Sequence, residues 1–138
     1  MQIRELSLQE LDRVYDVIVQ HYSTLDYDLF EDLIYAMRHQ EYKMMGIFEQ
    51  EALVCYAGVS ICVSLEHGRH LNVYELITHT SQRRKGYAHH MVDYLHDYAK
   101  IRQCAHLVLY TADPLKEGGL FLEKVGFRNN AACFIKTL

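Results

Sequence analysis

The second half of the sequence predicts a strand–helix–strand crossover, which constrains the fold more than any other feature. Residues 71–78 (LNVYELIT) are typical of a strand, and residues 86–103 carry apolar side chains at helical spacing. Residues 106–111 (HLVLYT) form a nearly continuous apolar run, which is typical of a strand buried on both faces. A strand–helix–strand crossover is therefore expected here, with a second strand that is buried on both faces.

The first half of the sequence predicts one strand, two helices and a pair of hairpin strands. Ser7 and Glu10 match a capping box, and the apolar side chains after it recur at helical spacing as far as Tyr22. A second helical pattern follows, with one apolar face formed by Phe30, Leu33, Ile34 and Met37. The expected strands are residues 2–6, 43–48 and 52–65, with turns at 50–51 and 66–69.

A last helix and a last strand complete the expected order of elements. Pro114 suits the start of this helix, and Gly126 suits its end. Residues 132–138 (ACFIKTL) are predicted to form the closing strand. The order β-α-α-β-β-β-α-β-α-β has no linker or repeat, so we expect one α/β (α+β) domain over residues 1–138, with a mixed, mostly antiparallel sheet and about four helices.

Composition and charge exclude several classes of protein. The formal net charge is −4, and 23% of the residues are charged, which argues against general binding to nucleic acid or to a membrane surface. No apolar run approaches the roughly 20 residues of a membrane span, and MQIRELSLQE has no signal-peptide core. The four cysteines are scattered without a CxxC pair, which fits reduced thiols. A cytoplasmic location is expected.

A basic loop lies between the strand at 71–78 and the helix at 86–103. Three cations at positions 83–85 precede Gly86, and the small residue Ala88 follows. The first N–H groups of a helix lack intrahelical acceptors and carry partial positive charge, and a glycine lets an anion approach the backbone. The pattern GxxxxGK[ST] is absent, and no GxGxxG follows a strand. The loop therefore predicts an anion site, and the alternative is a solvated basic turn.

At this loop the sequence resembles the GCN5-related N-acetyltransferases (GNAT). Their signature [QR]xxGx[GA] stands here as Arg83-Arg84-Lys85-Gly86-Tyr87-Ala88. Upstream, ELITHTSQRRKGYA resembles the family's fourth strand and its exit, and downstream FLEKVGF (121–127) resembles the family's FYEKLGF ending. The order of elements fits a minimal version of the family's fold.

The resemblance implies that acetyl-CoA is the co-substrate and that its diphosphate lies on the basic loop. The backbone of Arg84, Lys85, Gly86, Tyr87 and Ala88 then inherits the pyrophosphate role, with Arg83 close by. The strand segment Leu76, Ile77 and Thr78 inherits the pairing with the pantetheine arm, between a fourth and a fifth strand that splay apart. The acyl group is then expected in a cleft beside the first two helices, and a homodimer is possible because dimers are common in the family.

The sequence also departs from the family pattern. A tyrosine that commonly protonates the leaving thiolate is replaced here by Leu122, which cannot donate a proton. An asparagine and an alanine that are often found nearby are replaced by Leu115 and Gly118. Two functions therefore stay open: acetyl transfer from acetyl-CoA to an amine in a ternary complex, and a non-catalytic acyl-CoA-binding module of the same fold.

Several residues are candidates for the remaining roles. Glu75 lies just before the pantetheine segment, where a carboxylate could deprotonate an ammonium through water, although a strand glutamate is commonly ion-paired or exposed. Asp26, Tyr27 and Asp28 lie where the family receives its acceptor and would suit a cationic amine, or they form only a turn. The nine histidines show no recognised ligand spacing, so no metal is expected. Polyamines, amino acids, aminoglycosides, small metabolites and protein amines all remain possible acceptors.

Overall fold

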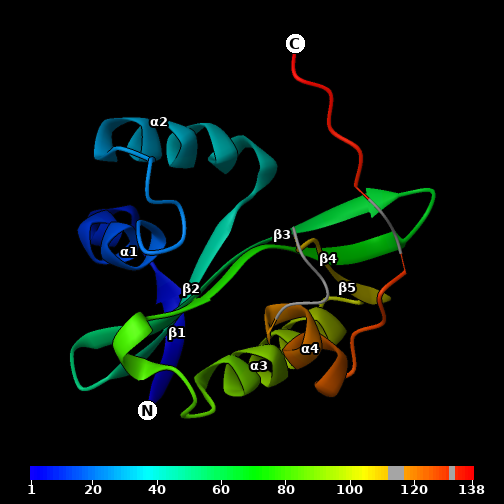
Figure 1. Cartoon of the computed structure of the whole chain (residues 1–138). Coiled ribbons are helices and arrows are strands. Elements are labelled where there is room, and N and C mark those ends of the chain that lie inside the picture. The colour runs from blue at the N-terminus through cyan, green and yellow to red at the C-terminus, as the bar shows by residue number, and fades with distance from the viewer. Residues whose placement is uncertain (112–116, 131–132) are drawn as a thin grey trace. The chain divides into compact units, whose positions relative to one another are not determined.

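The computed structural model describes residues 1–111, 117–130 and 133–138. Contacts divide the chain into two compact units, Met1–Val108 and Leu109–Leu138 (Figure 1). The first unit contains nearly all of the sheet and three of the α-helices, and it carries the residues that the sequence assigns to catalysis, to the cofactor and to the acceptor.

A five-stranded mixed sheet organises the first unit. Its strands follow one another in chain order: β1 (Gln2–Leu6), β2 (Lys43–Glu49), β3 (Ala52–Ser64), β4 (Gly68–Thr78) and β5 (His106–Leu109). The first four strands pair antiparallel: β2, β3 and β4 follow one another as hairpins, whereas α1 and α2 lie in the chain between β1 and β2. Next to the start of β5, the Ala105 N–H donates to the Arg69 carbonyl at 2.7 Å, near the start of β4. The predicted fold class and all five strands of this sheet are confirmed. The predicted burial of the strand at 106–111 on both faces is wrong: β5 is last in the strand order, His106 is exposed and residues 107–109 are only half-buried, because an apolar run does not specify how many neighbours a strand has.

Three helices cover the two faces of the sheet. Helix α1 (Leu11–Ile18), which follows a short 3-10 turn (Leu8–Glu10), lies with α2 (Tyr27–Met37) over one face. Helix α3 (Tyr87–Ile101) lies over the other face (Figure 1). The first helix ends before Tyr22, because the N–H groups of His21 and Tyr22 both bond to the Ile18 carbonyl and close the helix in a turn.

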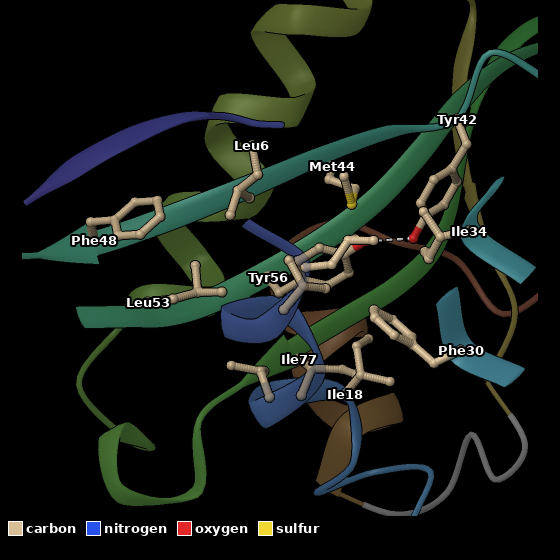
Figure 2. Packing of buried hydrophobic residues seen from close by; sticks show 13 residues of the cluster. Leu6, Ile18, Phe30, Ile34, Tyr42, Met44, Phe48, Leu53, Tyr56 and Ile77 are labelled. Carbon is tan, nitrogen blue, oxygen red and sulfur yellow. Dashed lines mark hydrogen bonds between the residues drawn. The ribbon is translucent and has the colours of Figure 1, made fainter. Parts of the chain in front are cut away.

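The core forms because strand side chains alternate between these two helical layers. On β2, Met44 and Phe48 belong to the cluster under α1 and α2, whereas Met45 and Ile47 alternate with them toward the opposite face. Figure 2 shows the first cluster, in which side chains from both helices and from β2, β3 and β4 converge. Each fully buried aliphatic side chain stabilises the fold by roughly 1.5–3 kcal/mol relative to exposure. This packing fixes the strand register.

The second unit contains helix α4 (Glu117–Lys124). The helix ends as predicted at Gly126, whose φ of 102° allows a left-handed turn. The Phe127 N–H bonds to the Leu122 carbonyl at 2.9 Å and the Gly126 N–H to the Glu123 carbonyl at 3.1 Å, which is the Schellman pattern. The predicted helix start at Pro114, together with Leu115, lies outside the described residues.

The predicted closing strand is wrong for the part of it that the structure describes. Residues 133–138 have no regular secondary structure, and Phe134, Ile135 and Leu138 are exposed. A strand exists only where a neighbouring strand accepts and donates its backbone hydrogen bonds, and an apolar sequence pattern does not supply that neighbour. This limit is weaker for β2–β4, because short turns hold these three strands next to one another.

Across these described ranges, no helix is both long enough and apolar enough to cross a membrane.

Candidate functional site

Glu75 on β4 is held by a chain of two tyrosine hydroxyl groups. The Tyr42 hydroxyl donates a hydrogen bond to Glu75 Oε1, and the hydroxyl oxygens of Tyr42 and Tyr56 are 2.6 Å apart. Each phenol carries one proton, so if Tyr42 donates to the carboxylate, Tyr56 must donate to Tyr42. Figure 2 shows the second of these hydrogen bonds as a dashed line between the side chains of Tyr42, which directly precedes β2, and Tyr56 on β3. The arrangement directs two O–H dipoles toward one carboxylate.

A β-bulge places Glu75 at this position. Gly58 pairs with Glu75, but Val59 pairs with Val73, so Tyr74 is an extra residue in β4. The Tyr74 ring packs edge-on against the Tyr42 ring at 5.5 Å, and its hydroxyl oxygen is 2.8 Å from Ser60 Oγ. Consecutive side chains of β4 therefore both contact Tyr42, which regular alternation would not permit.

Gly58 provides the space for this cluster. A Cβ atom at this position would collide with the Tyr42 hydroxyl group and with Glu75 Oε1. The glycine therefore lets the carboxylate and the phenol meet across β3. Any side chain here would have to displace one of the two groups that form the hydrogen bond.

Burial changes the titration of this cluster. Loss of water raises the pKa of Glu75 to about 7, and the hydrogen bond from Tyr42 opposes this by stabilising the carboxylate. The pKa values of Tyr42 and Tyr56 lie well above the ordinary value for a phenol, mainly because both side chains are buried. Near neutral pH, Glu75 can therefore both accept and release a proton, while both tyrosines stay protonated.

Glu75 and Tyr42 line a cavity of about 510 Å³, which we call the α1–α2 pocket. Its apolar lining comes from the end of α1, the following loop and α2: Ile18, Leu25, Leu29, Phe30, Leu33, Ile34 and Met37. Its polar lining consists of His21, Tyr22, Ser23, Thr24, Tyr42 and Glu75. The volume is within the range of small-molecule sites. The pocket combines a mostly apolar wall with one titratable carboxylate.

The basic loop (residues 83–88) lies between β4 and α3, as predicted. Gly86 is the N-cap of α3 with φ 86°, and Arg84 has φ 64°, so two left-handed residues turn the backbone just before the helix. Glycine has no side chain that could cap the helix, and the first N–H groups of α3 have no intrahelical acceptor. Arg83 to Lys85 and Gly86 are exposed, so a diphosphate would meet both backbone donors and cations.

Hydrogen bonds connect the basic loop with the pocket. Arg83 Nε donates to the Thr78 carbonyl at 3.4 Å, and Gln20 at the end of α1 accepts from the Thr80 N–H at 2.9 Å. Gln20 Nε2 also lies 2.9 Å from His79 Nε2. Thr78 is three residues beyond Glu75 on an extended strand, a span of about 10 Å. Leu76, Ile77 and Thr78 therefore connect the carboxylate of the pocket with the loop.

The residues that the sequence assigned to the acceptor lie beside the pocket and do not line it. Asp26 is the N-cap of α2 and accepts from the Leu29 N–H at 2.8 Å. The Tyr27 ring packs against Tyr15 and Phe30, and Asp28 is exposed in the first turn of the helix. Residues 23–25 and Leu29 line the pocket instead. An acceptor role for Asp26, Tyr27 and Asp28 stays a prediction.

The remaining candidates from the sequence are the cysteines, the histidines and Leu122. All four cysteines are free, and burial raises the pKa of the Cys55 thiol to about 11. The rings of His67 and His70 contact each other, but within the described part of the chain no three potential ligands are arranged to hold a metal ion. Leu122 lies half-buried on α4, in the second unit. Leu122 cannot donate a proton to a leaving thiolate, and no other residue is assigned this role.

Sequence reasoning missed the residues that surround Glu75. Tyr42, Tyr56, Gly58 and Tyr74 have no local pattern that distinguishes them from other strand residues. They come together only through the register of three strands and one bulge. The basic loop can be recognised from a run of consecutive residues. The residues of this cluster are far apart in the sequence, so no such run identifies them.

Comparisons with known proteins identify the family of this chain. Residues 5–127 match the acetyltransferase (GNAT) family. An uncharacterized N-acetyltransferase of Bacillus subtilis (strain 168), YhdJ, is 25% identical over 132 residues, which cover 94% of this chain and 93% of that protein.

Solved structures show the same fold at lower identity. A ribosomal-protein-alanine N-acetyltransferase from Brucella melitensis biovar Abortus 2308 has a TM-score of 0.83 at 18% identity, over 99% of this chain and 98% of the other. An aminoglycoside N-acetyltransferase, AAC(6')-Iy, in complex with CoA has a TM-score of 0.83 at 12% identity, over 99% and 93%. With its family matched over residues 5–127, the chain belongs to the acetyltransferase (GNAT) family.

Proposed function

We propose that this protein transfers an acetyl group from acetyl-CoA to a primary amine, with both substrates bound at once. The observation that carries the proposal is the position of Glu75, a carboxylate with a pKa of about 7 that lines a pocket and immediately precedes the β4 segment leading to the basic loop. One end of this segment suits proton transfer and the other suits a diphosphate. Acetyl transfer to an amine needs both.

The basic loop fits the CoA diphosphate. Gly86 and Arg84 give the backbone a left-handed turn before α3, and the exposed cations at positions 83–85 add attraction. Residues 76–78 pair with β3 through Ala57, Tyr56 and Cys55, so these residues are held straight along the path to the pocket. Acetyl-CoA supplies the activated acyl group, and these residues hold and orient it.

Glu75 acts on the amine. An alkylammonium must lose a proton before its nitrogen can attack the thioester carbonyl carbon, and Glu75 accepts this proton through water. A C–N bond forms as the C–S bond breaks, and the CoA thiolate leaves with the bonding electrons. The nitrogen then loses its second proton to the departing thiolate or to water, which leaves a neutral amide. A thiol with a pKa of about 8.5 is a fair leaving group, so the absence of a tyrosine at Leu122 does not prevent the step.

The buried thiol of Cys55 supports direct transfer of the acetyl group, without an acetyl-cysteine intermediate. Burial raises the pKa of Cys55, and a neutral buried thiol is a poor nucleophile. A covalent acetyl-cysteine intermediate therefore lacks an activated thiolate at this position. The amine and the thioester are expected to react within one ternary complex.

The proposal is tested by measuring CoA release with a panel of primary amines and the binding of CoA by calorimetry. We expect CoA binding together with amine-dependent release of CoA and formation of an acetylated amine detected by mass spectrometry. CoA binding without turnover on any amine would contradict the proposal and indicate an acyl-CoA-binding module instead.

A further inference from the structure

We infer that the acceptor is a primary monoamine with an apolar body, such as an arylalkyl or alkyl amine, which binds in the α1–α2 pocket with its ammonium group at Glu75. This inference rests on the acetyl transfer proposed above and specifies its substrate. Polyamines and aminoglycosides carry additional positive charges, and amino acids carry a carboxylate. The pocket offers a second cation no second carboxylate.

The charges of the pocket favour a single cation. Glu75 is the single carboxylate among the described residues that line it, and Tyr42, which also lines the pocket, donates a hydrogen bond to it. The acidic residues of the adjoining helix, such as Asp28 and Asp32, are exposed and do not line it. A second ammonium group would find no second carboxylate in this lining, and the hydroxyl groups of Ser23 and Thr24 would compensate its loss of water only in part. Polycationic amines should therefore bind poorly.

The apolar wall favours a hydrophobic body on the amine. Leu29 and Leu33 both line the pocket, yet they remain 49% and 46% exposed. They are four residues apart on α2 and therefore lie on one helix face, and Met37 follows after another four. An apolar ligand would cover these side chains, and each buried CH₂ group favours binding.

The size of the pocket is consistent with a small amine. A cavity of about 510 Å³ lies in the lower half of the range for small-molecule sites, which is about 300–1,000 Å³. The Phe30 side chain contributes an aromatic surface to the lining, and so does Tyr22, whose pKa is raised by partial burial and, to a smaller extent, by the Glu75 carboxylate. A ring or a short alkyl chain therefore has both apolar and aromatic neighbours.

The experiment compares kcat/KM for 2-phenylethylamine and n-hexylamine with that for spermidine and kanamycin, at fixed acetyl-CoA. We expect the two apolar monoamines to exceed both polycations by at least about tenfold. A preference for spermidine or kanamycin would overturn the inference and leave acetyl transfer itself in place. Equal activity on all four amines would overturn it as well.

Matched variants on α2 test the apolar wall. Leu33→Ser should lower kcat/KM for 2-phenylethylamine about tenfold, with little change for methylamine, which is too short to reach the wall. Tyr35→Ser is the control, because Tyr35 is also 46% exposed on α2 but does not line the pocket. Equal losses in the two variants, or no loss in Leu33→Ser, would overturn the inference.

Direct binding separates this inference from the proposed function. Calorimetry with 2-phenylethylamine and CoA-saturated protein measures occupancy of the pocket without any chemical step. If the amine binds, if Leu33→Ser weakens this binding, and if no turnover follows, the pocket's preference for apolar monoamines is supported. The same result would refute acetyl transfer. Absence of binding for both apolar amines would overturn the preference itself.

Discussion

The basic loop and the Glu75 cluster are built in opposite ways. The loop is a run of consecutive exposed residues, and its expected function comes from backbone geometry at Arg84 and Gly86 and from the start of α3. The Glu75 cluster combines Tyr42, which directly precedes β2, with residues from β3 and β4, and its expected function comes from burial and hydrogen bonds. Substitutions in the loop should therefore affect binding of CoA, and substitutions in the cluster should affect the rate and its pH dependence.

The largest expected effect is the loss of CoA binding in Gly86→Val. A β-branched residue is strained at φ 86°, and its side chain would obstruct the approach of a diphosphate to the backbone. We expect calorimetry to detect no binding of CoA.

Gly68→Val is the matched control for this prediction. Gly68 also has positive φ, 62°, with open space around it, but it begins β4 at the far end from the loop. Valine should strain the backbone at both positions, and only the loop variant should lose CoA. Unchanged affinity in folded Gly86→Val protein would refute the assignment of the loop.

The next largest effect is expected for Glu75→Gln. A glutamine keeps the shape and can still accept the hydrogen bond from Tyr42, but it cannot take a proton from the amine. We expect kcat/KM to fall by about 10² while CoA affinity is unchanged, and we expect the acidic limb of the pH–rate profile to disappear. Full activity with the same pH profile would make Glu75 a structural residue, and the base would then be sought among Asp26, Tyr27 and Asp28.

Much of the fold and one of these two regions could be predicted from the sequence. The strands β1–β4 and the helix α3 follow from periodicity, and the basic loop follows from six consecutive residues. Helical spacing also identified the apolar face of α2, but it did not distinguish Phe30 and Ile34, which are buried in the core, from Leu33, which is half exposed at the pocket. Periodicity reports that a face is apolar and does not report what covers it.

The remaining residues of the site could not be predicted because they depend on contacts distant in the sequence. Tyr42 meets Glu75 only because β2 and β4 both flank β3, because Gly58 leaves space, and because a bulge adds Tyr74. The erroneous strand at 132–138 has the same cause, since a strand depends on a partner that its own sequence does not specify.

Tyr42→Phe should have an intermediate effect and distinguishes the two tyrosines of the cluster. The hydrogen bond from Tyr42 lowers the pKa of Glu75, so its removal should raise that pKa above about 7. The acidic limb of the pH–rate profile should move to higher pH, with a loss of about three- to tenfold at pH 7 and recovery at pH 9.

Tyr56→Phe is the matched comparison for this shift. It leaves the bond between Tyr42 and Glu75 in place, so the limb should move less than in Tyr42→Phe. An equal or larger shift in Tyr56→Phe would show that the order of donors in the cluster is not Tyr56 to Tyr42 to Glu75.

The stability of the cluster should depend on pH in a direction set by the pKa of Glu75. This pKa rises on folding from 4.5 to about 7, so the folded protein binds the proton more tightly than the unfolded chain. The free energy of unfolding should therefore fall as pH rises from about 4.5 to about 7. Relative to wild type, Glu75→Gln should gain up to about 2–3 kcal/mol at pH 8 and little at pH 4. Urea unfolding at both pH values measures this difference, and a gain of equal size at both would contradict the assigned pKa.

The smallest effect is expected for the cysteines, which belong to neither region. Cys55 pairs with Thr78 across β3 and β4, but its thiol is fully buried and its pKa is raised to about 11, so it stays protonated. Replacing Cys55 by alanine and Cys62, Cys104 and Cys133 by serine should leave kcat/KM within about twofold, provided that circular dichroism shows the fold is retained. Cys55→Ser alone is the less suitable variant, because a hydroxyl group would be buried where a thiol was tolerated. Ping-pong kinetics in the wild type, or an acetylated cysteine peptide after incubation without amine, would refute direct transfer even if Glu75→Gln behaved as expected.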